Sequence, residues 1–133
     1  MAIFNKEIET GAKLPSFSKQ LTLDMFKSGD VKTIHNDMEA AQREGLPAPI
    51  AVGPQTAALI FKMMSTTFEE GWYEGGKASV TFRRPIFCNE FITAKGFVKE
   101  KVPEGEKTRI ICEVWIEKLS GEKAVVGTCS ALV

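Results

Sequence analysis

The sequence has little of what builds a disulfide framework or a metal centre. Its 133 residues include three cysteines and a single histidine. Cys88, Cys112 and Cys129 show no C-x-x-C spacing, so neither a disulfide framework nor a thiol-redox pair is indicated. One histidine excludes a multi-histidine metal site, and we expect no metal. Unpaired cysteines of this kind are typical of a reducing, cytoplasmic setting.

Long apolar runs and a net charge are also missing. The most apolar stretch, residues 57–64, is interrupted by Lys62 and is far shorter than the roughly 20 residues that span a bilayer. Residues 1–10 carry three charges and no apolar segment of the kind found in secretory signals. Seventeen basic residues balance seventeen acidic ones, and the basic residues are scattered. We therefore expect neither a membrane nor a nucleic acid as partner.

What is present is enough material for one packed domain. The hydrophobic fraction of 44% and the charged fraction of 26% are ordinary for a globular protein. A chain of this length buries roughly two-thirds of its unfolded surface, so a core can form without disulfides or metals. No repeat, low-complexity tract or linker divides the sequence. We expect a single domain over residues 1–133.

The first third of the chain predicts a short strand and a short helix. The strand is expected over residues 19–23, after a loop that contains Pro15. Asn36 with Glu39 three residues later forms a capping-box pattern for the helix. Asp37 is the alternative cap, and Gly45 ends the helix under either assignment.

A second, longer helix is expected from Gln55 to about Thr67. Gly53 and Pro54 precede it, and proline fits the first turn of a helix because no helical bond needs its missing N–H. Apolar residues cover most of its circumference. Such a helix must be enclosed on most sides.

From Gly76 onward the hydrophobic period changes from that of a helix to that of a strand. Apolar and polar residues alternate over 78–83, 92–99 and 109–117, and a tight turn leads into a last strand over residues 123–132. Consecutive antiparallel strands with one buried helix indicate the α+β class. A curled antiparallel sheet wrapped around one long central helix resembles the hot-dog fold.

The polar segment 28–37 holds the best candidates for chemistry. Asp30 and His35 lie in it, between the first strand and the capped helix. A carboxylate and an imidazole differ in proton affinity, so together they can remove one proton and deliver another. The alternative is that Asp30 caps a turn and His35 bonds to it only to fix the loop. Spacing does not separate these interpretations.

The segment also carries a family resemblance. Ser-Gly-Asp, an aliphatic residue, His, one further residue and Asp resemble the signature of the MaoC-like dehydratases and (R)-specific enoyl-CoA hydratases, here as Ser28, Gly29, Asp30, Ile34, His35 and Asp37. The resemblance extends from about residue 9 through Arg83, Arg84 and Pro85 to the closing strand. The resemblance therefore spans nearly the whole chain, and it implies the hot-dog fold.

The resemblance assigns roles to individual residues. It implies that Asp30 and His35 hold a water and act jointly as general base and acid. It places the backbone N–H of Gly53 against the thioester oxygen, and the positive end of a helix suits the charge that develops there. The alternative for Gly53 is simple helix-entry geometry beside Pro54.

Other positions are expected around the substrate. Lys32 and Thr33 replace the family's usual Asn-Pro, and Val52 replaces its usual His before the helix-entry glycine; with Ser28 they are candidates for the pocket wall. Arg83 and Arg84 could meet the phosphates of coenzyme A, since guanidinium groups suit phosphate. The alternative is that these arginines are solvated or serve a subunit contact.

The resemblance implies reversible addition of water across the 2,3-double bond of an acyl thioester. Coenzyme A or an acyl carrier enters as part of the substrate, and no separate cofactor is expected. A homodimer or higher homo-oligomer is expected because an isolated curled sheet leaves edge strands that a second copy can cover. Two rivals stay open: an acyl-CoA thioesterase on the same fold, and a subunit that binds acyl thioesters without turnover.

Overall fold

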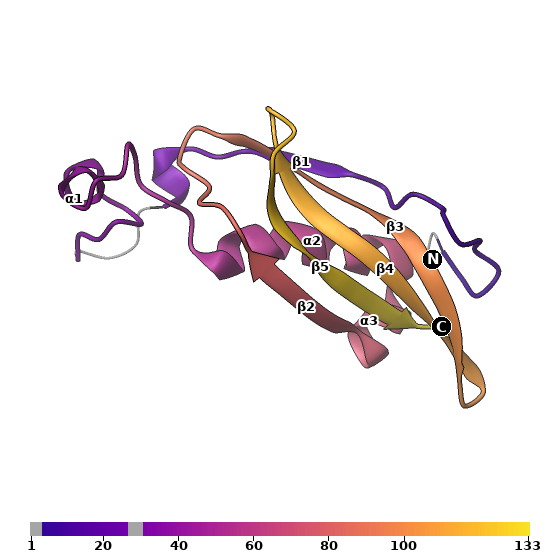
Figure 1. Cartoon of the computed structure of the whole chain (residues 1–133). Coiled ribbons are helices and arrows are strands. Elements are labelled where there is room, and N and C mark those ends of the chain that lie inside the picture. The colour runs from indigo at the N-terminus through magenta and orange to yellow at the C-terminus, as the bar shows by residue number, and fades with distance from the viewer. Residues whose placement is uncertain (1–3, 27–30) are drawn as a thin grey trace.

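The architecture is an antiparallel sheet with one long helix across it (Figure 1). The computed structural model describes residues 4–26 and 31–133. Its elements, in chain order, are β1 (Phe17–Gln20), the 3₁₀ helix η1 (Leu23–Met25), α1 (Met38–Arg43), α2 (Gly53–Phe68), α3 (Glu70–Gly75), β2 (Lys77–Phe82), β3 (Phe91–Glu104), β4 (Lys107–Lys118) and β5 (Lys123–Leu132).

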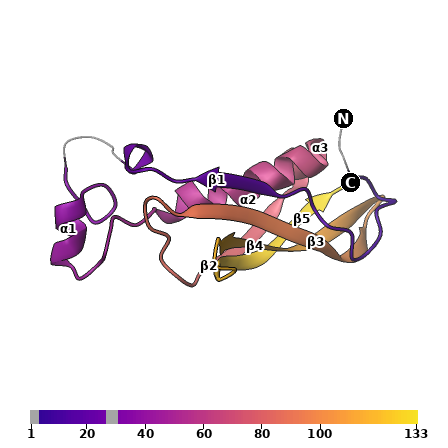
Figure 2. The same ribbon diagram turned by 90° about the horizontal axis from the view of Figure 1, so that it is seen from above.

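The sheet is open, with the strand order β1-β3-β4-β5-β2. Each strand pairs antiparallel with its neighbours, so β1 and β2 form the two edges. The strands curve past α2, which lies against one face of the sheet (Figures 1 and 2). The predicted α+β class, with a curled antiparallel sheet around one long helix, is confirmed.

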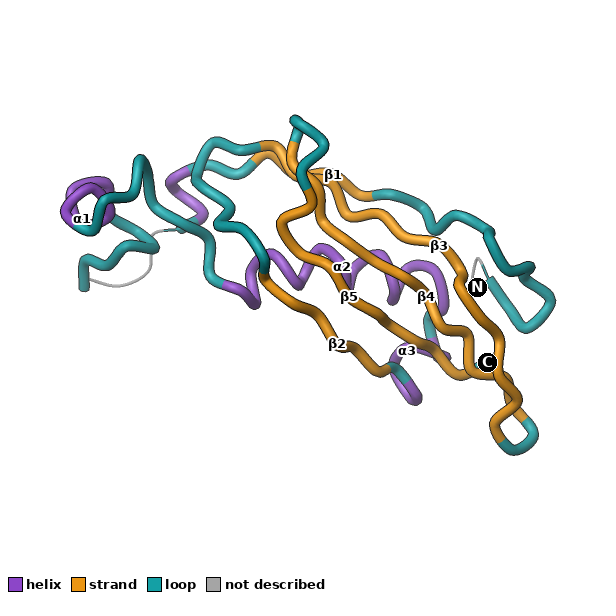
Figure 3. The backbone as a smooth tube through the Cα atoms, viewed as in Figure 1, coloured by secondary structure: helices purple, strands orange, loops and turns teal. Residues whose placement is uncertain are grey.

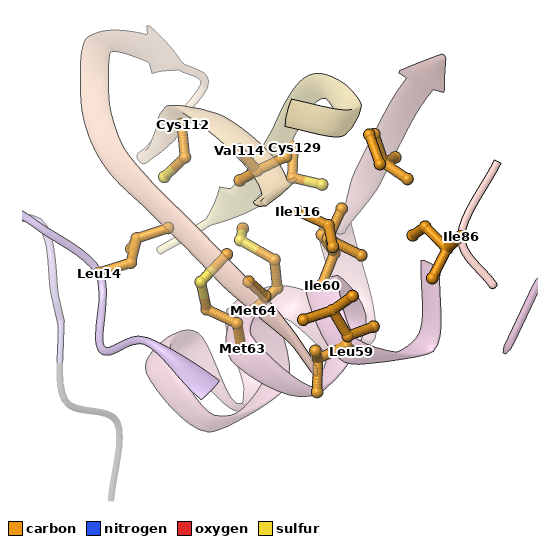
Figure 4. Close-up of a cluster of buried hydrophobic side chains, with 14 of the residues drawn as sticks. Leu14, Leu59, Ile60, Met63, Met64, Ile86, Cys112, Val114, Ile116 and Cys129 are labelled. Atoms are coloured by element: carbon orange, nitrogen blue, oxygen red, sulfur yellow. The ribbon is translucent and has the colours of Figure 1, made fainter. Parts of the chain in front are cut away.

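The core fills the space between α2 and the sheet. The residues of β3 and β4 predicted to face inward are 0–1% exposed, and Figure 4 shows Cys112, Val114 and Ile116 among them: Ile92, Ala94, Val98, Ile110, Cys112, Val114 and Ile116. The same prediction is wrong for the edge strand β2, where Ala78 and Phe82 are exposed and Val80 is half-buried. From α2, Ile60, Met63 and Met64 are 0% exposed. Burial of each large side chain stabilises the fold by about 1.5–3 kcal/mol, so this layer fixes the position of α2 on the sheet.

The prediction that α2 is enclosed on most sides is wrong for one face. Phe61 is 37% exposed, and Ala58 and Lys62 beside it are exposed too. The sheet covers only the opposite side of the helix, which leaves this stripe uncovered. Helix α2 also begins at Gly53, earlier than the expected Gln55, because Pro54 is itself part of the first turn.

The first strand and the first helix also differ in detail from their predictions. Strand β1 covers Phe17–Gln20 and not residues 19–23, because its pairing with β3 ends where Phe91 faces Gln20. Asp37, and not Asn36, caps α1: its side chain accepts a hydrogen bond from Ala40 N at 2.9 Å. Gly45 follows the helix with a φ of 81°, as expected for a stop signal.

Helix α1 belongs to an arm, residues 31–50, that extends beyond the end of the sheet. Figures 1 and 2 show α1 apart from the sheet in both views, and Figure 3 shows the loops that connect it. Backbone hydrogen bonds fasten the base of this arm, with Cys88 N donating to Pro49 O at 2.9 Å and Ala51 N donating to Ile86 O at 2.8 Å. No helix in the described ranges is long and apolar enough to cross a membrane.

Two buried cysteines face each other inside the sheet. Cys112 on β4 is the register partner of Cys129 on β5, and both are 0% exposed. Burial raises the pKa of both thiols to about 12, and the charge of Cys129 contributes to the shift at Cys112. Both thiols are therefore protonated packing groups at neutral pH.

This pair predicts a loss of stability in alkali. An unfolded chain ionises its thiols near 9.0 while the folded chain holds them protonated until about 12, so the free energy of unfolding falls as pH rises through that window. Denaturant unfolding across the window measures the slope. In the double variant Cys112→Ala/Cys129→Ala, the part of this slope that comes from ionisation of the two thiols should disappear. Val114→Ala, which truncates an equally buried side chain without a titratable group, should keep the parental slope. Equal slopes in the two variants would contradict the assignment of this pH dependence to Cys112 and Cys129.

Candidate functional site

A cavity of about 420 Å³ opens beside the first turn of α2. We call it the Gly53 cavity. Aliphatic and small side chains form its interior and charged side chains stand at its edge; its lining is Ile50, Ala51, Gly53, Thr56, Phe82, Arg83, Arg84, Pro85, Ile86 and Val125. The loop before α2, the helix itself, the end of β2 and strand β5 all contribute. Packing of α2 on the sheet therefore creates the cavity.

Gly53 is the first residue of α2, at the positive end of the helix. Its N-cap, Val52, makes no side-chain hydrogen bond to the first turn, and Pro54 has no N–H. A Cβ at position 53 would lie 2.9 Å from Cζ of Phe82, closer than side-chain atoms normally approach. Glycine therefore lets the ring of Phe82 approach the start of α2, and any larger residue would have to displace that ring.

Phe82 is a site residue that the sequence reasoning did not single out. It ends β2, faces the helix, and is 51% exposed although it is aromatic. The alternation of Phe82 with Thr81 and Arg83 indicates which face of β2 the ring lies on. It does not show that the ring contacts Gly53. The signal that could have found it is its position directly before the Arg83-Arg84 pair.

His35 lines a second cavity, of about 760 Å³, inside the arm. We call it the His35 cavity; its lining is Lys32, Thr33, Ile34, His35, Ala40, Arg43, Glu44, Leu46 and Ile50. The ring Nδ1 of His35 lies 3.0 Å from the carbonyl oxygen of Ile50. Because a carbonyl only accepts, Nδ1 must carry the hydrogen and donate it. In the neutral ring Nε2 is then the nitrogen whose lone pair can accept a proton.

Ile50 connects the two cavities. It lines both of them, and its carbonyl oxygen holds the ring of His35 while its N–H donates to Ile34 O at 3.0 Å. The next residue, Ala51, lines the Gly53 cavity. The described structure thus places His35 and Gly53 on neighbouring cavities, close to a shared wall. Asp30 and Ser28 lie outside the described residues, so their predicted roles stay predictions.

Of the remaining candidates in the described residues, all but Val52 line one of the two cavities. Lys32 and Thr33 line the His35 cavity, where Thr33 Oγ1 accepts a hydrogen bond from His35 N at 3.1 Å and shapes the loop. Arg83 and Arg84 are exposed at the mouth of the Gly53 cavity. Val52 is 40% exposed and caps α2 without lining that cavity. Among residues 4–26 and 31–133, no group of three or more His, Cys, Asp or Glu side chains could hold a metal.

Comparison with known proteins identifies a family and a fold. The family described as "MaoC like domain" matches residues 4–114. A search of curated proteins found no match. The solved structure of R-hydratase PhaJ1 from Pseudomonas aeruginosa superposes with a TM-score of 0.79 at 23% identity, over 98% of this chain and 84% of that chain.

Two further solved structures have the same fold. The (R)-hydratase from A. caviae involved in PHA biosynthesis has a TM-score of 0.75 at 22% identity, over 94% of this chain and 96% of that one. The HadBC (3R-hydroxyacyl-ACP dehydratase) complex from Mycobacterium tuberculosis has a TM-score of 0.72 at 11% identity, over 96% and 99%. These likenesses confirm the hot-dog fold.

The bond from His35 to Ile50 predicts a single ring tautomer. In ¹⁵N-detected NMR at a pH where the imidazole is neutral, Nδ1 should show the shift of a protonated nitrogen and Nε2 that of an unprotonated one. His35 is the single histidine of the chain, so both signals belong to it, and their couplings to the carbon-bound ring hydrogens tell Nδ1 from Nε2. The urea-unfolded chain provides the control, with both tautomers in exchange. A folded protein protonated at Nε2 would contradict the geometry.

Proposed function

Because the chain belongs to the MaoC-like domain family, we propose that it is a hydro-lyase that adds water reversibly to the 2,3-double bond of an acyl thioester. The observation that carries this proposal is the anchored ring of His35. Its Nδ1 donates a hydrogen bond to the carbonyl oxygen of Ile50 at 3.0 Å. Ile50 lines both the His35 cavity and the Gly53 cavity at the start of α2. A base with one anchored nitrogen thus lines a cavity that shares Ile50 with the cavity at the start of α2.

The reaction needs two proton transfers, and Asp30 and His35 share them in this proposal. One group takes a proton from a bound water as its oxygen forms a bond to the β-carbon. The other delivers a proton to the α-carbon, and the double bond becomes a single bond. Acid and base exchange roles in the reverse direction, which eliminates water.

Gly53 stabilises the charge that forms between these transfers. As the water oxygen attacks, negative charge moves to the thioester oxygen, and the Gly53 N–H at the positive end of α2 is the proposed donor. The ring of Phe82 lies next to Gly53, which is half-buried. A hydrogen bond to a developing charge is worth more in such a partly dry site than in water.

The substrate's carrier meets the charged edge of the cavity. Arg83 and Arg84 are exposed at its mouth, where guanidinium groups can contact the phosphates of coenzyme A or of the carrier-bound arm. No cofactor is required beyond the carrier itself. The cytoplasmic location expected from the cysteines is part of the same proposal.

Substitution of the proton carriers tests this function. Asp30→Asn and His35→Ala should each lower kcat/KM for hydration of crotonyl-CoA by about 10²- to 10⁴-fold, because one proton transfer loses its carrier. Loss of the enoyl absorbance measures the rate. Asp24→Asn, a change of the same kind at an exposed aspartate, is the matched control and should retain the parental rate.

Each rival function has its own signature in that assay. Release of free thiol in step with the loss of absorbance would establish a thioesterase instead, because hydration leaves the thioester bond intact. Binding of crotonyl-CoA without either change would establish a binding subunit. Near-parental hydration by either the Asp30 or the His35 variant would refute the acid/base assignment.

We also propose that the chain acts as a homodimer. Strand β2 is an edge of the sheet, and α2, whose first turn lies against Phe82 of β2, exposes Phe61. The ring of Phe61 packs on that of Trp72 with centroids 5.9 Å apart, so it is held in place and not free to fold inward. A second copy placed on β2 and this face of α2 would cover both the unpaired strand edge and the apolar stripe.

Phe61→Glu should convert the dimer into a monomer, because it buries a carboxylate in the proposed interface. Sedimentation velocity measures the mass, and circular dichroism checks that the fold is intact. Leu119→Glu is the matched control: Leu119 is 83% exposed in the turn between β4 and β5, away from β2 and α2. A parental chain that sediments as a monomer, or a Phe61 variant that stays dimeric, would contradict the proposal.

A further inference from the structure

The Gly53 cavity is shallow along the helix. On α2 its lining consists of Gly53 and Thr56, which lie three positions apart and span about one turn, about 5 Å. The next residue on this face is Ile60, four positions after Thr56, and it is 0% exposed. Beyond Ile60, Met63 and Met64 are also 0% exposed and fill the core. The cavity therefore ends at the second turn of α2.

The sheet closes the cavity at the same depth. Val125 on β5 lines it and is 1% exposed. Its register partners are Phe82 on one side, which also lines the cavity, and Ile116 on the other, which is 0% exposed. Ile60 and Ile116 belong to one buried cluster (Figure 4). Two closely packed isoleucines thus lie behind the lining residues.

The side chains that line the Gly53 cavity are charged at its mouth and apolar at its closed inner end, which we call its floor. Arg83 and Arg84 stand at the mouth, and Ile86 and Val125 lie inside. Thr56 is the one hydroxyl of the lining, and it already donates to Gly53 O at 3.0 Å. A bound chain would therefore meet apolar surface and no free donor at the inner end, which suits an unsubstituted alkyl group.

From this closed floor we propose that the cavity selects thioesters of short acyl chains, a few carbons long, and that Ile60 and Val125 set the length limit. The inference rests on the proposed function, because it takes an acyl thioester as the ligand. A longer chain would have to displace side chains from a close-packed core, which costs more than its added apolar contact returns.

Binding of saturated acyl-CoA esters tests the limit without any need for turnover. Isothermal titration of the full chain should give an affinity for butyryl-CoA about tenfold or more above that for decanoyl-CoA. Truncation of the floor in Ile60→Ala or in Val125→Ala should narrow or reverse this ratio by raising the affinity for decanoyl-CoA. Two variants on different elements keep the test open if one of them fails to fold.

Ile110→Ala is the matched control, because Ile110 is the same residue type, is also 0% exposed, and lies on β4 away from the cavity lining. It should leave the parental ratio unchanged. Parental binding of decanoyl-CoA as tight as that of butyryl-CoA would overturn the length limit. A shift in the Ile110 variant equal to that in the floor variants would overturn the assignment to Ile60 and Val125.

The same proteins assayed for hydration of crotonyl-CoA and decenoyl-CoA separate this inference from the proposed function. Length selection in binding without hydration would refute the hydro-lyase and support the short-chain site. Hydration of both substrates at equal kcat/KM would support the hydro-lyase and overturn the length limit. Failure of both acyl-CoA esters to bind would overturn the two proposals together.

Discussion

The packing of one face of α2 against the sheet is the interaction on which the rest of this structure depends. Ile60, Met63 and Met64 on the helix meet the inward residues of β3, β4 and β5 in one buried cluster. This contact excludes water from most of the apolar area and so provides the main driving force for folding. It also fixes the start of α2, which is the point that the candidate site requires.

The fixed start of α2 positions the residues of the candidate site. Gly53 lies where the helix begins, and the end of β2 brings the ring of Phe82 so close that a side chain at position 53 would have to displace it. The chain before the helix, through Ile50, turns back into the arm and holds His35 by its ring. The contact between α2 and the sheet thus supports the inner end of the Gly53 cavity. The arm beyond the end of the sheet supplies the imidazole of His35.

Features with a local cause were predictable from the sequence. The alternation that buries Ile110, Cys112, Val114 and Ile116 follows from the pleat of a strand, in which every second side chain shares a face. Pro54 in the first turn and Gly45 after α1 follow from backbone geometry at single residues. The choice of Asp37 over Asn36 as cap was open at that level, because both side chains can accept the same kind of hydrogen bond.

By itself, then, the sequence determined the element types, the inward faces of β3 and β4, and the residues of the polar segment that contains His35. It could not determine which distant segments meet. The contact of Phe82 with Gly53, the bond from His35 to Ile50, the closed floor at Ile60 and Val125, and the exposed stripe at Phe61 all join residues far apart in the chain or depend on which side the sheet covers. Local propensity carries no information on such long-range contacts, and tertiary packing decides them.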